Sequence, residues 1–213
     1  MPIASPISDS QAARILQRYP NSEQTSLTDP WEATAQTVRY MCRLIRHSQS
    51  DGVVQAALAE ALRRFPNRHP AESIWWYAKF SIRFIHHQKL LRAWLGKADE
   101  LQLLISPEAL LKMKGPKGDC AVFTCLICAM LDCAGVPWEI LTVAVDPRQP
   151  HIFSHVYPVA ILENGERLPL DASHGKYPGW EVDSRRVSLR QAWDSAGNPI
   201  QDDSFFFENR RAA

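Results

Sequence analysis

Hydrophobic residues repeat at helical spacing through the first half of the chain. Val38, Met41, Cys42 and Ile45 lie three and four positions apart, which places their side chains on one face of a helix. Asp-Pro-Trp-Glu at residues 29–32 supplies a capping acid, a first-turn proline and a second acid, all typical of a helix start. These signals predict a helix over residues 29–48.

Further helices are expected on both sides of this one. Residues 53–64 keep helical spacing and stop before Pro66, and another helix begins after Pro70. The helix after Pro70 carries apolar side chains for which core packing is expected, namely Ile74, Trp75, Ala78, Ile82 and Ile85. A short amphipathic helix is expected over residues 11–18, whereas residues 90–105 fit neither a helix nor a strand pattern clearly.

The middle of the chain combines a helix-breaking segment with a strong helix pattern. A short helix is expected over residues 106–113, followed by Lys-Gly-Pro-Lys-Gly at 114–118, which is rich in turn formers. Residues 119–134 then read as a helix that ends at Gly135 and Pro137. Its apolar positions are Val122, Phe123, Leu126, Ile127, Met130 and Leu131.

The pattern changes to strands after this helix. Residues 139–145 are rich in strand formers, and residues 152–162 are separated from 167–170 by Asn164-Gly165, the strongest short hairpin signal. The chain beyond Asp171 reads as irregular. Helices followed by strands predict an α+β fold with helices packed on an antiparallel sheet. We expect residues 1–65 to form an N-terminal helical segment packed on a core of residues 66–213.

Composition and charge narrow the function classes. The 213 residues are 46% hydrophobic and 22% charged, with a net charge of +1, which is typical of a globular protein and lacks the basic excess of a nucleic-acid binder. The apolar stretches are shorter than the ~20 residues of a membrane span. Residues 1–10 lack the features of a signal peptide, and the cysteine count of five is odd. We therefore expect a cytoplasmic protein with free thiols and neither a nucleic-acid nor a membrane partner.

Cys120 is the residue with the clearest chemical potential. It stands at the expected helix start, directly after the Gly-rich loop. Unpaired N–H groups and the positive end of the helix dipole meet there, and they favour a thiolate nucleophile and could stabilise an oxyanion. Gly115 and Gly118 leave room for a substrate, while Asp119 opposes a thiolate unless it caps the helix. The competing interpretation is a structural cysteine.

The remaining cysteines raise the possibility of a metal or redox site. Cys120, Cys125, Cys128 and Cys133 have a spacing like that of plant-type ferredoxin clusters. Cluster ligands require a loop, whereas these residues fall in a helix pattern that points the first and last to nearly opposite sides. We therefore expect no metal and no cofactor, and we interpret Cys125 and Cys128 as small core residues.

A base and its partner are expected on neighbouring strands. His155 shares a strand face with Phe153 and Tyr157, and Asp171 ends the next strand. Each has an ordinary alternative, a packing histidine and a turn-forming aspartate, and His151 has the same parity as His155. In the order Cys120, His155, Asp171, the residues fit a nucleophile, a general base and an orienting carboxylate.

These motifs together resemble the transglutaminase-like superfamily. Its pattern is a cysteine at a helix start, a histidine in one strand and an aspartate in the next, matched here by Gly-Asp-Cys at 118–120, Ser-His-Val-Tyr at 154–157 and Pro-Leu-Asp at 169–171. Three flanking motifs agree: Ser-Pro-Glu-Ala-Leu-Leu at 106–111, Gly-Val-Pro at 135–137 and Pro-Gly-Trp-Glu at 178–181, the last resembling bacterial and phage versions. Papain-type proteases separate Cys and His by about 130–150 residues, against 155 − 120 = 35 here.

The resemblance implies a papain-like α+β core and a thioester mechanism with Cys120, His155 and Asp171. The oxyanion or substrate candidates are Gly118, Asp119, Trp75, Trp76 and Gln102. The expected partner is a peptide or protein acyl donor, with hydrolysis by water favoured over transfer to an amine. The alternative is a catalytically silent binding or assembly module. By analogy with phage relatives, it could be a virion-associated particle component with a phage or host protein partner.

Overall fold

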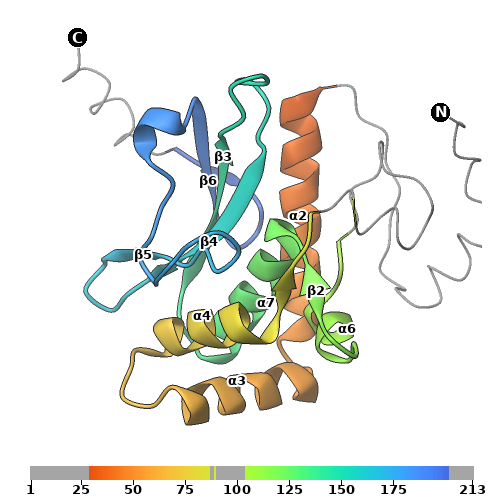
Figure 1. Ribbon diagram of the computed structural model, residues 1–213, viewed down its shortest axis with the longest axis vertical. Helices are drawn as coiled ribbons and strands as arrows, with labels where there is room; N and C mark the ends of the chain where they lie inside the picture. The colour runs from red at the N-terminus through yellow and green to blue at the C-terminus, as the bar shows by residue number, and fades with distance from the viewer. Residues whose placement is uncertain (1–28, 87–88, 90–103, 202–213) are drawn as a thin grey trace, which may run out of the picture.

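The computed structural model describes residues 29–86, 89 and 104–201. The helix expected over residues 11–18, most of the ambiguous stretch 90–105 and the candidate Gln102 lie outside these described residues. Figure 1 shows helices gathered on one side and a twisted sheet on the other, which is the α+β arrangement that the sequence predicts. None of the described helices combines the length and hydrophobicity that a membrane crossing requires.

The first three described helices match the sequence pattern closely. They are α2 (Pro30–Ser48), α3 (Gly52–Arg64) and α4 (Pro70–Ser81). Asp29 caps α2 by accepting a hydrogen bond from the Glu32 backbone N–H at 2.7 Å, which satisfies one orphan donor of the first turn. The helix expected to reach Ile85 ends at Ser81, because the chain becomes extended there and pairs with the segment before Cys120.

That pairing is parallel and was not expected from the sequence. Strand β1 (Arg83–Phe84) lies beside β2 (Lys117–Gly118), with Phe84 opposite Gly118. Ile85 donates its backbone N–H to the Gly118 carbonyl at 2.9 Å. The Gly-rich segment is therefore held by a neighbouring strand two residues before Cys120. The short helix α6 (Pro107–Leu111) precedes it.

Helix α7 (Cys120–Cys133) runs through the centre of the molecule. All eleven residues from Ala121 to Leu131 are buried, and the helix contacts α2, α3, α4 and strand β4. Figure 1 shows it enclosed by those helices on one side and by the sheet on the other. A helix that is hydrophobic all round belongs in a core, so the cysteines within it, Cys125 and Cys128, are core residues.

The five-stranded sheet is antiparallel throughout, in the order β5-β4-β3-β6-β7. Its strands are β3 (Trp138–Ala144), β4 (His155–Ile161), β5 (Arg167–Pro169), β6 (Leu189–Trp193) and β7 (Pro199–Ile200). The expectation of irregular structure after Asp171 was wrong for β6 and β7. These strands are short and partly polar, and β6 exists because it pairs along β3, with Leu141 opposite Ala192.

The two faces of the sheet carry separate hydrophobic clusters. Ile140 and Ala160 pack in the main core with α7, whereas Leu141, Val143 and Tyr157 belong to a second cluster on the other face. This alternation follows from the two-residue period of a strand. Residues of α2 and α3 also belong to the main core. The boundary between residues 65 and 66 stays a prediction.

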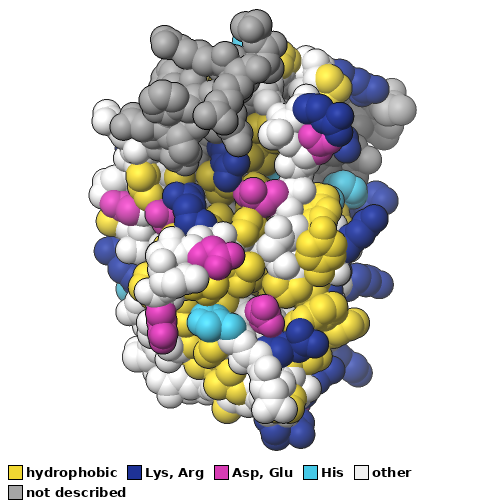
Figure 2. All heavy atoms as spheres, turned by 90° about the vertical axis from the view of Figure 1, so that its left-hand side faces the viewer, with side chains coloured by type: hydrophobic (Ala, Val, Ile, Leu, Met, Phe, Trp, Pro, Cys, Tyr) yellow, Lys and Arg dark blue, Asp and Glu magenta, His cyan; other side chains and the backbone are white. Residues whose placement is uncertain are grey.

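The exposed surface mixes all side-chain types. The face in Figure 2 has acidic, basic and hydrophobic side chains side by side, with Lys and Arg gathered along its right-hand edge. The most exposed large aromatic side chain among the described residues is Phe80, at 64%. Its ring stacks on those of Trp76 and Phe65, and Arg68 lies 5.8 Å from the centre of the Trp76 ring.

Candidate active site

Cys120 is the first residue of α7 and is half-buried. Asp119 precedes it as the helix cap, and its Oδ1 accepts a hydrogen bond from the Val122 N–H at 3.1 Å. The carboxylate is thus engaged by the helix start, as expected if Asp119 caps. A Cβ on Gly118 would lie 2.4 Å from the Val122 side chain, so the close approach of the loop to the helix requires glycine here.

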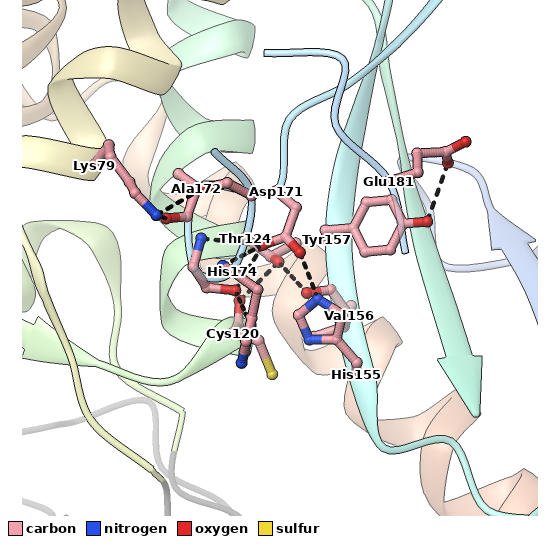
Figure 3. A network of polar contacts seen from close by, with 12 residues as sticks. Lys79, Cys120, Thr124, His155, Val156, Tyr157, Asp171, Ala172, His174 and Glu181 are labelled. Atoms are coloured by element: carbon pink, nitrogen blue, oxygen red, sulfur yellow. Dashed lines mark hydrogen bonds and ion pairs between the residues drawn. The ribbon is translucent and has the colours of Figure 1, made fainter. Parts of the chain in front are cut away.

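His155 faces this helix start from the first position of β4. Its Nε2 lies 2.7 Å from Asp171 Oδ2, and both side chains are almost completely buried. The other ring nitrogen, Nδ1, is therefore the one left for an interaction with Cys120, which is among the causes that raise the pKa of His155. Figure 3 shows Cys120, His155 and Asp171 close together at the end of α7, with the His155 ring between the thiol and the carboxylate.

The charge state of this cluster follows from its contacts. Burial lowers the pKa of His155, but hydrogen bonds to Asp171 and Cys120, with their charges, outweigh it and raise the pKa from 6.5 to about 10. Burial raises the pKa of Asp171, yet the hydrogen bond and positive charge of His155 hold it below its ordinary value. The arrangement therefore favours an imidazolium beside a carboxylate, with the thiol on the opposite side of the ring.

Asp171 is held by more than its bond to His155. Its Oδ1 accepts hydrogen bonds from the Ser173 N–H at 3.0 Å, the Ser173 hydroxyl at 2.7 Å and the His174 N–H at 3.0 Å. All these donors lie within three residues of Asp171, so its turn-forming role and its contact with His155 coexist. One oxygen organises the turn and the other holds the imidazole.

Lys79, on α4, ties the same loop to the helical layer. Its ammonium donates hydrogen bonds to the carbonyls of Ala172 at 3.0 Å and Gly175 at 2.8 Å. Gly175 also donates its N–H to the Asp171 carbonyl at 2.9 Å, and a Cβ there would lie 2.2 Å from that oxygen. No motif or spacing identified Lys79, because its role depends on α4 packing beside a loop more than 90 residues away in sequence.

His174 is a second histidine that the sequence analysis missed. Its ring meets the His155 ring edge-on at 4.6 Å and the Phe84 ring at 4.7 Å. Burial and the nearby positive charge of His155 lower the pKa of His174, so the ring is neutral while His155 is charged. Phe84 brings this contact from β1. The only signal in the sequence was the position of His174 three residues after Asp171.

Metal ligands converge at this place in the described part of the chain. His155, Asp171 and His174 each offer a ligand atom within 4.8 Å of the others. His155 Nε2 and Asp171 Oδ2 cannot both bind one ion as they stand, because they are 2.7 Å apart. Tetrahedral zinc with ligands at about 2.0–2.1 Å separates them by roughly 3.3 Å. The 2.7 Å contact places no such limit on Nδ1 of His155 or on the ring nitrogens of His174.

The other predicted residues occupy different environments. Trp75 is fully buried in the main core, and Trp76 is half-buried with its ring edge-on to Trp75 at 4.7 Å. The rival base His151 lies in an exposed turn before β4. Of the two histidines, His155 is the one bonded to Asp171.

The other four cysteines are poor nucleophiles in this fold. Burial raises the pKa of Cys42 to about 12 and holds the pKa values of Cys125 and Cys128 well above 9.0. Partial burial and Asp132 raise the pKa of Cys133. All five cysteines are free thiols. Cys120 differs from Cys42, Cys125 and Cys128 in being partly exposed, and from the partly exposed Cys133 in lying at the start of α7 rather than at its end.

Comparisons with known proteins do not show a family for this chain. No protein-family model matches it, and no curated protein matches it. Among solved structures, it is similar to the crystal structure of a “putative protease” from Parabacteroides distasonis, with 14% sequence identity and a TM-score of 0.46. The match covers 77% of this chain and 30% of that protein. This chain therefore spans less than a third of the protein that it resembles.

Proposed function

We propose that this protein is a transglutaminase-like enzyme that transfers acyl groups through a thioester on Cys120. The observation that carries the proposal is the imidazole of His155, which bonds Asp171 through Nε2 at 2.7 Å and lies beside the Cys120 side chain in Figure 3. Nucleophile, base and orienting carboxylate in this order are the elements of covalent acyl-transfer catalysis. The substrate class would be an amide of a peptide or protein.

Each residue has a defined role in this reaction. The Cys120 sulfur attacks the carbonyl carbon, and the proton held by His155 passes to the departing amine as the C–N bond breaks. Water or an amine then attacks the thioester, gives a proton to His155 and releases the Cys120 thiolate. Asp171 keeps Nε2 protonated and so leaves Nδ1 facing the sulfur.

The start of α7 supports stabilisation of the oxyanion. The first N–H groups of a helix have no partner within the helix, and that of Val122 is used by Asp119. The N–H groups of Cys120 and Ala121 belong to the first turn of α7, where the reacting sulfur also lies, and they are the proposed oxyanion donors. Gly118 and Asp119 would act by shaping this turn, and Trp75 and Trp76 stay candidates for a further contact.

The test is acylation of the purified protein by a panel of peptide and peptidoglycan-derived acyl donors, read by intact-protein mass spectrometry. We expect an adduct on Cys120 that is absent from Cys120→Ala and present in Cys133→Ala, a matched removal of another partly exposed thiol. If a Cys120-selective alkylating probe labels the protein but no donor in the panel acylates it, the silent binding module replaces the enzyme. An adduct that persists in Cys120→Ala would show that another residue is the nucleophile.

The acceptor is decided by supplying the donor with and without millimolar primary amine. We expect hydrolysis to dominate, because efficient amine transfer requires a closed groove that excludes water, and Cys120 is half-buried rather than enclosed. Product that carries mainly the amine would make the enzyme a transferase.

A further inference from the structure

One side chain of α4 holds the turn over residues 171–175. Lys79 donates hydrogen bonds to the carbonyl of Ala172 at 3.0 Å and to that of Gly175 at 2.8 Å. Its ammonium also lies 5.7 Å from the centre of the Trp75 ring, within the range of a cation–π contact. This half-buried cation therefore has two partners in the turn and one on its own helix.

A single amide connects the cation with the carboxylate. The Ala172 carbonyl and the Ser173 N–H belong to the same peptide unit, and this N–H donates to Asp171 Oδ1 at 3.0 Å. A cation at the carbonyl oxygen polarises the amide and strengthens its N–H as a donor, because hydrogen bonds in a chain reinforce one another. Asp171 Oδ2 then continues the chain to His155 Nε2 at 2.7 Å. Figure 3 shows Lys79 and His155 on opposite sides of Asp171.

The other contacts of the turn leave this carboxylate little freedom. Gly175 donates its N–H to the Asp171 carbonyl at 2.9 Å. The Ser173 hydroxyl uses its one proton in the 2.7 Å hydrogen bond to Asp171 Oδ1, so at its 2.9 Å contact with His174 Nδ1 the imidazole is the donor. The donors to Oδ1 all belong to the turn. The position of the turn therefore fixes the direction in which Oδ2 points.

We propose that Lys79 is a positioning residue for the acyl-transfer reaction, which acts on His155 through the polarised amide and Asp171. Its two hydrogen bonds fix the turn against α4, and its positive charge strengthens the Ser173 donor and favours the ionised carboxylate. The inference rests on the proposed function, because orienting Asp171 affects the reaction only if His155 is the base.

The test measures how fast iodoacetamide labels Cys120 as a function of pH. Lys79→Met removes the charge and both donors but keeps a side chain of similar length beside Trp75. We expect labelling at neutral pH to slow by about threefold or more, within the range of couplings inside one hydrogen-bond network. The midpoint of the pH profile should rise, because a weaker contact with Asp171 stabilises the imidazolium less. Lys176→Met, which removes an exposed lysine next to the same turn, should label at the wild-type rate.

Two further variants separate positioning from a general loss of structure. Lys79→Arg keeps the positive charge and the hydrogen-bond donors, so it should recover most of the wild-type rate. In an Asp171→Asn background, Lys79→Met should slow labelling no further, because its effect passes through the carboxylate that the first substitution has already removed.

Four results would overturn the proposal: a wild-type rate in Lys79→Met, an unchanged pH midpoint, equal rates in Lys79→Arg and Lys79→Met, or the same slowing by Lys79→Met with Asp171 present and replaced. Circular dichroism melting of each variant checks that the chain is folded. If Lys79→Met does not fold, Lys79→Gln, which keeps amide donors without the charge, must slow labelling or the proposal is rejected. Labelling requires no acyl donor, so the two proposals fail separately. Absence of acylation by every donor rejects the proposed function, whereas slower labelling in Lys79→Met still supports the action of Lys79 on Asp171.

Discussion

Replacing Asp171 by Asn isolates the contact on which the proposed mechanism depends. Asn has the same shape, and its carbonyl oxygen can still accept the three hydrogen bonds that Oδ1 receives from Ser173 and His174. The other position becomes an NH₂ group facing His155 Nε2, which is 2.7 Å from Oδ2 in the wild type. The NH₂ group and a protonated Nε2 are both donors, so His155 must lose its Nε2 proton and keep the proton on Nδ1. A protonated Nδ1 cannot accept the proton of the Cys120 thiol.

The magnitude follows from the lost bond. A hydrogen bond to a charged group contributes about 1.5–3 kcal/mol, and each 1.36 kcal/mol is a factor of ten. Alkylation of Cys120 by iodoacetamide at neutral pH should therefore slow by about 10-fold to 150-fold. Turnover of any acyl donor should fall by up to about 10⁴, the loss known for triads with the wrong imidazole tautomer.

Stability should change little, because His155 loses a proton and becomes neutral in this variant, so no buried charge is left without a partner. We expect the melting temperature to stay within about 4 °C of wild type, since about 1 kcal/mol corresponds to 2–4 °C for a domain of this length. Asp183→Asn is the matched control, because that carboxylate pairs with Arg185 on the surface. A variant at Asp171 that melts much earlier but alkylates at the wild-type rate per folded molecule would refute the reasoning and make this residue structural.

Three further predictions concern single residues. Under limited iodoacetamide, Cys120 should label before the other four cysteines, and faster labelling of Cys42, whose pKa is raised to about 12 by burial, would remove the nucleophile assignment. His155→Ala should slow the labelling of Cys120 at neutral pH while His151→Ala leaves it unchanged, and the reverse result would identify His151 as the base. Gly175→Ala should lower the free energy of unfolding by more than about 2 kcal/mol, measured by urea denaturation, because a Cβ would lie 2.2 Å from the Asp171 carbonyl oxygen. An unchanged urea midpoint would show that the loop relaxes around the added methyl group.

Local signals in the sequence were sufficient for much of the helical layer. Capping acids, first-turn prolines and apolar spacing predicted α2 and α7 to within two residues at each end, because these features act within a few positions of one another. They were insufficient where pairing partners are distant. Strand β6 lies inside the sheet, between β3 and β7, yet its five residues contain Arg190 and Gln191 and acquire their conformation from pairing with β3.

The sequence by itself determined which residue types could do chemistry: a cysteine at a capped helix start, and a histidine and an aspartate on successive strands. Only the tertiary structure decided which atoms meet. The contact of Lys79 with the Asp171 loop and the packing of Phe84 against His174 join segments about 90 residues apart, and no periodicity records such contacts. The tautomer of His174 likewise depends on one hydroxyl proton that Asp171 already uses. Hydrogen bonds and ring contacts act over a few ångströms, so they are specified only when the packed core has brought their groups together.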